Sequence, residues 1–232
     1  MSDSIDIINA FALLTNFVIL PALSYGSQLA LGALAVTLVY SVLRFSNFAQ
    51  GDSMAFGTMI VILLTGFMIN QGWTISGIPT ALLVIPVAII GTAIYLLSID
   101  RLVYKFYRRI KPKSITFCMA SIGVMFVTGG LVRFILGPRP QIFADGERFI
   151  FSVREFKAFT GLEQGIALKT SQFLTVTIAI LLVAFVFYFL QKTKTGKAMR
   201  AYSDNEELAL LSGIDPDKVV TVTWLLVATL TT

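Results

Sequence analysis

The sequence predicts an all-α, polytopic integral membrane protein that folds as a helical bundle. Hydrophobic residues make up 56% of the chain and charged residues only 13%, and the mean hydropathy is +0.82. A soluble domain of this size would carry about twice that charged fraction. The apolar residues also form runs of about 20 residues with few or no charges, which is the length a helix needs to cross a membrane.

The composition also excludes several kinds of functional site. The chain contains no histidine, so it has no Ser-His triad, imidazole metal site or histidine proton relay. Cys118 is the only cysteine, which rules out an intrachain disulfide. The net charge of +5 comes from basic residues beside the apolar runs, and we interpret these as topology signals. The sequence therefore indicates no cofactor, no metal and no nucleic-acid partner.

The first predicted span covers about residues 22–43, which carry no charge. The residues before it, 1–21, begin with the acidic Asp3 and Asp6, and their apolar residues are interrupted by Asn9, Asn16 and Pro21. We interpret residues 1–21 as an interfacial or partly inserted lead-in. A further span within residues 5–20 is the alternative, and it would move the N-terminus to the other side of the membrane.

A polar turn, RFSNFAQGDS at residues 44–53, separates the first span from the second, at about 54–70. Asp52 and Ser53 suit the N-cap position of the second span. Two interpretations stay open: an ordinary tight turn, or a structural turn packed among helices near a transport pathway. The second interpretation makes four residues candidates for the site: Asn47, Gln50, Gly51 and Asp52.

The basic loops set the expected topology. The third span covers about residues 80–99, and the loop at 100–113 that follows holds six basic residues and one acid, which places it in the cytoplasm. Further spans at about 114–136 and 171–190 then flank an external loop, 137–170, in which a small cap or hairpin is plausible. A cytoplasmic loop at 192–218 leads to a sixth span at 219–232. That last stretch is shorter than the ~20 residues a span needs, so we expect the chain to be truncated within it.

The sequence of the cytoplasmic loop at 192–218 predicts a folded segment and not an irregular connection. Its sequence predicts a helix that starts at a capping box formed by Ser203 and Glu206 and ends at a left-handed stop at Gly213. Leu208 and Leu211 provide an apolar face. A helix this short does not persist alone in water, so it must lie either on lipid headgroups or on a partner. The neighbouring acidic residues favour a partner, because an anionic membrane surface would repel them.

Several of these stretches, in this order, resemble one family: the membrane permeases of branched-chain amino-acid ABC importers, and among them the first of the two permease subunits. NFAQGD at 47–52 resembles the family's Asn-Phe-Ala-His/Gln-Gly-Glu/Asp signature. DRLVY at 100–104 is similar to its Glu-Arg-x-x-Tyr segment, although Lys105 and Phe106 replace the usual Arg-Pro. TGKAMRA at 195–201 and ALLSGI at 209–214 resemble its cytoplasmic loop.

The resemblance implies an N-terminal part of a permease that takes up branched-chain or related amino acids, without enzymatic activity, across the bacterial inner membrane. The implied partners are a second permease subunit, cytoplasmic ATP-binding subunits, a periplasmic solute-binding protein and the lipid bilayer. The short cytoplasmic helix would dock on an ATP-hydrolysing subunit. The residues implied in this coupling are Gly196, Arg200, Ala201, Ser203, Glu206, Leu208, Leu211 and Gly213.

Other functions remain as alternatives. The same machinery could carry urea or short amides, since nothing in these residues selects the solute. An energy-independent channel is less favoured, because no ring of acidic residues or carbonyl filter is apparent. An intramembrane enzyme is disfavoured by the missing histidine and by the lack of a carboxylate deep inside any predicted span. The chain has no G-x-x-x-x-G-K-[ST] motif, so ATP would be handled by a different chain.

Overall fold

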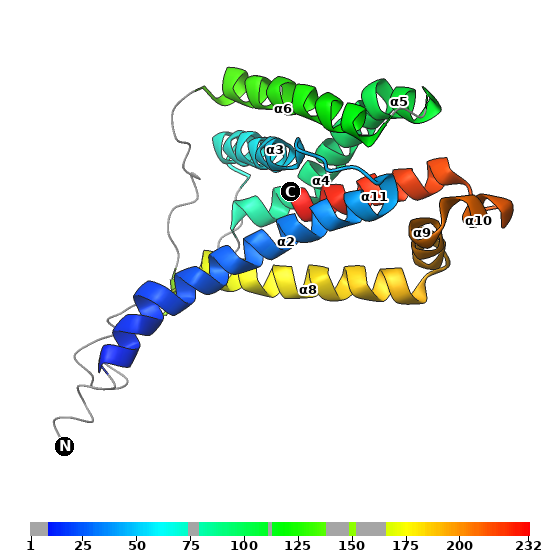
Figure 1. Cartoon of the computed structure of the whole chain (residues 1–232). Helices are drawn as coiled ribbons and strands as arrows, with labels where there is room; N and C mark the ends of the chain where they lie inside the picture. The colour runs from blue at the N-terminus through cyan, green and yellow to red at the C-terminus, as the bar shows by residue number, and fades with distance from the viewer. Residues whose placement is uncertain (1–8, 74–78, 111–112, 138–148, 152–165) are drawn as a thin grey trace. The chain divides into compact units, whose positions relative to one another are not determined.

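The computed structural model describes residues 9–73, 79–110, 113–137, 149–151 and 166–232. Most of these residues are helical, which confirms the predicted all-α membrane fold (Figure 1). Among these described residues, five helices are long and apolar enough to cross a membrane: Asn9–Leu43, Gln50–Asn70, Thr80–Ile110, Ser114–Leu136 and Thr170–Lys192. Most of the predicted external loop lies outside the described residues. The chain forms two compact units, one of residues 1–31 with 146–184 and one of residues 32–145 with 185–232.

The first unit contains the start of the long helix and a small strand pair. The helix runs through a π-helical turn, η1 (Thr15–Ile19), into α2 (Leu20–Leu43). Residues 9–21 therefore continue the helix and do not break it at Pro21, because the widened turn just before the proline accommodates the change in hydrogen bonding. Strand β1 (Phe149–Phe151) pairs antiparallel with β2 (Leu168–Lys169), within the loop for which the sequence suggests a small cap or hairpin. Helix α8 (Thr170–Lys192) starts directly after β2.

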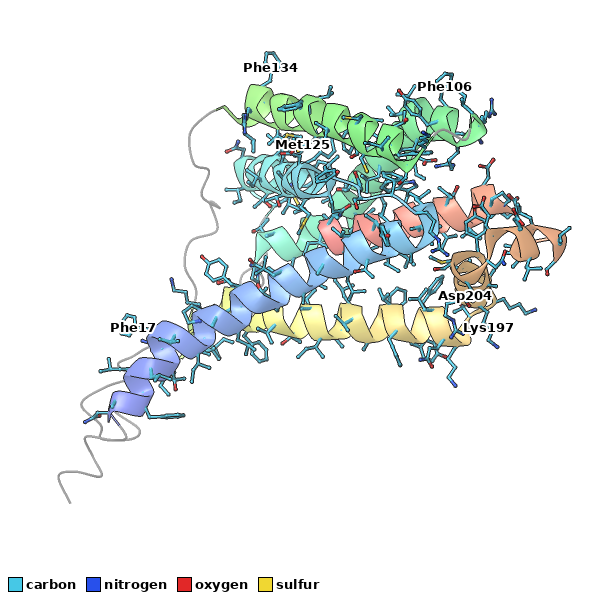
Figure 2. The ribbon with its side chains drawn as sticks, in the orientation of Figure 1. Phe17, Phe106, Met125, Phe134, Lys197 and Asp204 are labelled. Carbon is cyan, nitrogen blue, oxygen red and sulfur yellow. The ribbon has the colours of Figure 1, made fainter. Side chains whose placement is uncertain are left out.

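The second unit is built around α3 (Gln50–Asn70). This helix packs against α4 (Thr80–Ile99) and α6 (Ser114–Leu136), and α11 (Pro216–Thr231) packs against α4. Figure 2 shows Met125 pointing from α6 toward α3, whereas Phe134 points away from the helices. Phe134 is 90% exposed, as suits a residue that faces lipid.

The predicted cytoplasmic loop at 100–113 is mostly helical. Helix α4 continues through the π-helical segment η2 (Asp100–Tyr104) into α5 (Lys105–Ile110). The segment is therefore a continuation of α4 where the sequence predicts a loop, and Arg101 and Arg109 on it are exposed. Asp100 and Tyr104 are in fact buried, and Asp100 is paired.

Helix α3 begins at Gln50, four residues before the predicted start of the span. Asp52 and Ser53 are therefore inside its first turn and are not N-caps, which corrects the prediction. The carboxamide of Asn47 accepts the N–H of Ala49 at 3.1 Å and so forms the turn ahead of the helix. The Ser53 hydroxyl donates to the Ala49 carbonyl at 2.8 Å, within the helix.

Candidate functional site

The region after α8 turns sharply into α9 (Lys194–Asp204). Thr193 is the N-cap of α9, and its hydroxyl accepts the Gly196 N–H at 2.9 Å and donates to the Phe189 carbonyl at 2.7 Å. A Cβ atom on Gly196 would lie 2.2 Å from the Phe189 oxygen. Only glycine allows this approach of two backbones, so Gly196 sets the position of α9 at the end of α8.

The N-cap predicted at Ser203 is wrong. Ser203 lies in the last turn of α9, and the residue that caps the next helix, α10 (Glu206–Leu211), is Asn205. Asn205 has the extended backbone that an N-cap requires, with φ −149° and ψ 108°. Its Oδ1 atom accepts the Leu208 N–H at 3.1 Å. Ser203 is still part of α9, so its side chain does not cap α10.

Glu206 also bonds differently from the predicted capping box. Its carboxylate accepts the hydroxyl of Tyr202 at 2.9 Å, one turn back on α9. Burial of the Tyr202 ring, together with this bond, raises the pKa of Tyr202 to about 12. The phenol therefore keeps its proton at neutral pH and donates to Glu206, which joins α9 to α10.

Helix α10 exposes its leucines. Leu208 is 61% and Leu211 84% exposed, whereas Ala209 between them is buried. The predicted left-handed stop is present, since Gly213 has φ +81°. The Ile214 N–H donates to the Ala209 carbonyl at 3.0 Å and closes the helix.

Asp215 and Pro216 start α11 as the sequence indicates. The Asp215 carboxylate accepts the N–H groups of Asp217 and Lys218, and Pro216 is in the first turn. Helix α10 is thus held between a cap at one end and a tight turn at the other. The exposed Leu208 and Leu211 therefore lie on a short helix whose two ends are fixed.

A buried ion pair lies where α4 passes into η2, and sequence reasoning missed it. The Asp100 carboxylate accepts both terminal N–H groups of Arg108, at 2.6 and 2.9 Å, and the indole N–H of Trp224, at 2.8 Å. Asp100 is 6% exposed. The one available signal was a single acid at the head of a basic segment. The three donors satisfy the buried charge, as a buried carboxylate requires.

The same cluster anchors the polar turn at 44–53. The Tyr104 hydroxyl donates to the Oδ1 atom of Asn47 at 3.2 Å, and its ring stacks on Trp224 with centroids 5.7 Å apart. The ring of Phe45 lies 5.1 Å from that of Tyr104. The Phe48 N–H donates to the Ser121 hydroxyl of α6 at 3.2 Å. The turn is therefore joined to α6 through Phe48 and, through the bond of Asn47 to Tyr104, to the end of α4 and to Trp224 of α11.

The other three candidates of the turn lie in different surroundings. Gln50 is buried, and its amide atoms find no hydrogen-bond partner among the described residues. Gly51 is exposed. Asp52 is half-buried and faces α6, where a Cβ on Gly129 would lie 3.1 Å from its Oδ1 atom. The structure thus ties only Asn47 into the buried cluster, and Asp52 packs against a glycine on a neighbouring helix.

Helices α9 and α10 and the buried cluster around Asp100 meet at one cavity. Its volume is about 320 Å³, and Arg108, Tyr202 and Glu206 are among the residues that line it. Arg44 also lines it, and its guanidinium donates to the Ser203 carbonyl at the end of α9. Arg108 therefore stands between buried Asp100 on one side and the α9–α10 pair on the other. In the described part of the chain, no group of acidic or cysteine side chains could hold a metal ion.

A second ion pair, between α5 and α11, predicts a pH effect. The Lys105 ammonium donates to the Asp217 carboxylate at 2.8 Å, and this bond holds the pKa of Asp217 below its usual value. A depressed pKa contributes stability above the unfolded pKa, and this contribution is lost as the pH falls through the folded pKa. We expect Asp217→Asn to reduce the fall in melting temperature below about pH 4. At neutral pH its cost should stay under ~1 kcal/mol, because the pair is partly exposed.

Thermal unfolding in detergent between neutral pH and pH 3 measures this effect. Asp215→Asn is unsuitable as a control because Asp215 caps α11. Asp204→Asn, at an exposed acid, is the better match. If Asp217→Asn leaves the pH dependence unchanged while Asp204→Asn alters it, the ion pair between α5 and α11 does not control acid stability.

The comparisons with known proteins agree with this architecture. The family model "Branched-chain amino acid transport system / permease component" matches residues 18–232. The chain is 27% identical to the high-affinity branched-chain amino acid permease protein LivH of Salmonella typhimurium, over 87% of this chain and 63% of that protein. It is 25% identical to LivH of Escherichia coli K12, with the same coverage. It is 23% identical to BraD of Pseudomonas aeruginosa, over 90% of this chain and 65% of BraD.

No solved structure matches the chain. The chain spans about three fifths of the length of the LivH proteins that it matches, 63% of each. The family match covers 18–232, and therefore both the polar turn with its buried cluster and the α9–α10 region. The chain belongs to the family of branched-chain amino acid transport system permease components.

Proposed function

We propose that this protein is a membrane-spanning permease subunit of an ATP-driven, binding-protein-dependent importer for branched-chain or related amino acids. The observation that carries the proposal is a family match over nearly the whole chain, joined to a short helix whose leucines are exposed. The protein itself performs no covalent chemistry. It acts in the bacterial inner membrane as a multi-pass component.

The proposed contact with the ATP-hydrolysing subunit is α10. Exposed leucines at positions 208 and 211 on a capped helix suit insertion into an apolar groove, since burying them removes apolar surface from water. Glu206 is exposed beside them and can meet a basic rim. Gly196 and Gly213 set the path of the chain before and after the helix, and Arg200 and Ala201 flank it on α9.

Hydrogen bonds connect α9 and α10 to the membrane helices, and through them a movement of the docked helix would reach the membrane region. The Ser203 carbonyl at the end of α9 accepts a hydrogen bond from Arg44, which is the first residue of the polar turn. Arg108 lines the same cavity as Tyr202 and binds buried Asp100. We infer that the turn with Asn47, Gln50, Gly51 and Asp52 is a structural support near the cytoplasmic end of the solute pathway. The supporting observation is the hydrogen bond between Asn47 and Tyr104.

The remaining parts of the machine come from other chains. A second permease subunit would complete the pathway, a periplasmic binding protein would deliver the solute, and cytoplasmic subunits would hydrolyse ATP. The names of the relatives favour branched-chain amino acids over urea or short amides as the solute.

Reconstitution tests the proposal. The full-length permease is placed in proteoliposomes with its second permease subunit, its ATPases and its binding protein, and uptake of labelled leucine is followed with and without ATP. We expect uptake only when ATP and the binding protein are both present. Uptake down a gradient without ATP would establish a channel instead. ATP-dependent uptake of urea and not of leucine would refute the amino-acid assignment.

A further inference from the structure

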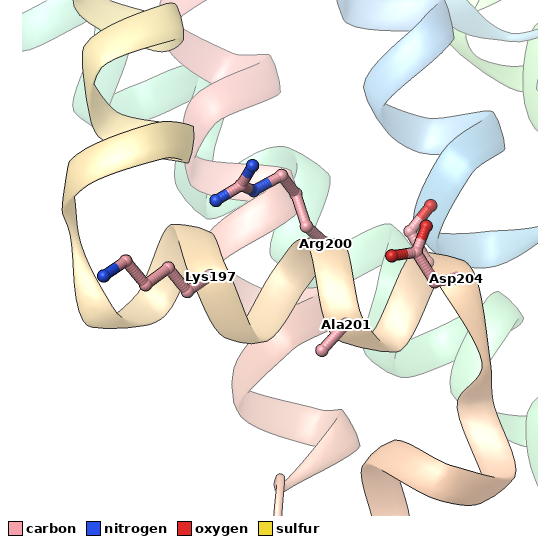
Figure 3. Close-up of a pocket in the computed structure, with 5 residues that line it drawn as sticks. Lys197, Arg200, Ala201 and Asp204 are labelled. Carbon is pink, nitrogen blue, oxygen red and sulfur yellow. The ribbon is translucent and has the colours of Figure 1, made fainter.

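A surface distinct from the α10 leucines lies along α9 and carries basic groups. A cavity of about 520 Å³ there is lined by Lys197, Arg200, Ala201, Ser203 and Asp204 (Figure 3). We propose that this cavity binds the phosphate of an anionic phospholipid headgroup at the membrane surface beside the end of α8. The proposal depends on the membrane placement of α8 and does not involve the α10 leucines.

The end of α8 lies at the level of the lipid headgroups. Phe187 and Tyr188 in its last turns are 64% and 63% exposed, and α8 ends four residues after Tyr188, at Lys192. Exposed aromatic residues followed by a basic residue are typical of a helix end at the membrane–water interface. The cavity on α9 therefore begins within a few residues of the headgroup region.

Helix α9 cannot swing away from that level. The Thr193 hydroxyl bonds to both Phe189 and Gly196, and the backbones of Gly196 and Phe189 approach too closely for any side chain to intervene. Met199 on α9 is buried as well. The cations of α9 are thus held beside the end of α8 by the fold of the chain.

The charges of the cavity fit one phosphodiester. Lys197 and Arg200 supply two positive charges and Asp204 one negative charge, so the lining carries a net charge of +1. Among the described residues, neither Lys197 nor Arg200 forms an ion pair. A guanidinium can donate to two phosphate oxygens at once, while an ammonium acts as a point charge. The Ser203 hydroxyl offers one more donor.

The direction of the side chains favours the membrane over a soluble partner. In Figure 3 the Arg200 guanidinium projects from α9 on the side where α8 lies, and the Ala201 methyl group points the opposite way. The exposed leucines are on a different helix, α10. Anionic lipids attract basic residues just outside a span, and this attraction falls off within about 10 Å. The Arg200 side chain thus projects on the side of α9 where the membrane helix α8 lies.

Lipid binding to the detergent-purified full-length chain, measured by native mass spectrometry, tests the proposal. Dioleoylphosphatidylglycerol and dioleoylphosphatidylcholine are the probes. We expect the chain to bind the anionic lipid in preference, and Lys197→Gln with Arg200→Gln to weaken that binding roughly 30-fold, as two basic residues near a membrane surface should. Arg200→Lys keeps the charge but loses the forked donor, so it should lose only part of the affinity.

The matched control is Lys192→Gln with Lys194→Gln, which removes the same charge from exposed positions that do not line the cavity. Helix content by circular dichroism verifies that each variant is folded. An equal loss in both double variants would show a general charge effect and overturn the cavity as a site. Displacement of phosphatidylglycerol by excess inorganic phosphate would show a site for the free anion, and would overturn the lipid assignment.

Discussion

Leu208→Asp combined with Leu211→Asp should abolish capture of the ATPase and all transport. Each leucine that becomes fully buried in a partner groove contributes about 1.5–3 kcal/mol, and an aspartate would bring an unpaired charge into the same groove. The expected loss is therefore more than 100-fold in affinity, since ~1.4 kcal/mol corresponds to a factor of ten. The measurement is pull-down of the ATPase from detergent-solubilised membranes that contain the full-length permease.

The controls for this result use the same helix. Leu208→Met with Leu211→Met keeps apolar side chains of similar volume and should bind almost normally. Asn205→Ala removes the cap of α10 and should weaken binding by about 1 kcal/mol, while Ser203→Ala should not weaken α10 because Ser203 does not cap it. Both leucines are exposed, so the double aspartate variant should still insert and fold. Normal recovery of the ATPase with that variant would remove α10 from the docking surface.

Arg108→Met should destabilise the protein by about 3–5 kcal/mol, which is the usual cost of removing one partner from a buried ion pair. The change leaves the Asp100 carboxylate buried, and within the described part of the chain the Trp224 indole N–H is the one side-chain donor that remains to it. The loss should also loosen the turn at Asn47, because Tyr104 joins that turn to Trp224. The free energy of unfolding, measured by titration with SDS in mixed micelles, gives the magnitude.

Two further variants show whether the ion pair is the cause. Arg109→Met removes an exposed arginine from the next position and should cost under ~1 kcal/mol. Asp100→Leu in the Arg108→Met background removes the orphaned charge and should restore most of the lost stability. If Arg108→Met and Arg109→Met cost the same, or if the second change gives no recovery, the buried pair has no special role.

Features of the fold that depend on residues close together in the sequence could be predicted. Hydropathy over about 20 residues indicates which segments are membrane helices, because lipid offers the backbone no other hydrogen-bond partners. The stop at Gly213 and the cap at Asp215 were also predictable, since each uses atoms within a few positions of its own. The leucines of α10 and its C-terminal turn belong to this class.

Features that depend on a choice between local alternatives were predicted less well. Ser203 and Asn205 are both good N-cap residues, and the sequence favours the capping box of Ser203 and Glu206. The structure uses Asn205, because α9 continues through Ser203 and Glu206 bonds to Tyr202. The choice depends on where the preceding helix ends, and that end is set by the packing of α9.

The sequence by itself determined the membrane class, a short helix that carries Leu208 and Leu211 and stops at Gly213, and the motifs that resemble the family. Only the tertiary structure decided that Asp100 is a buried partner of Arg108 and Trp224 and not part of a solvated basic loop. Trp224 lies 124 positions further along the chain, so no local pattern can bring the two together. The desolvation cost of a buried charge is offset only when hydrogen-bond donors surround it. Here the donors come from distant parts of the chain, so the packing of the helices brings them together.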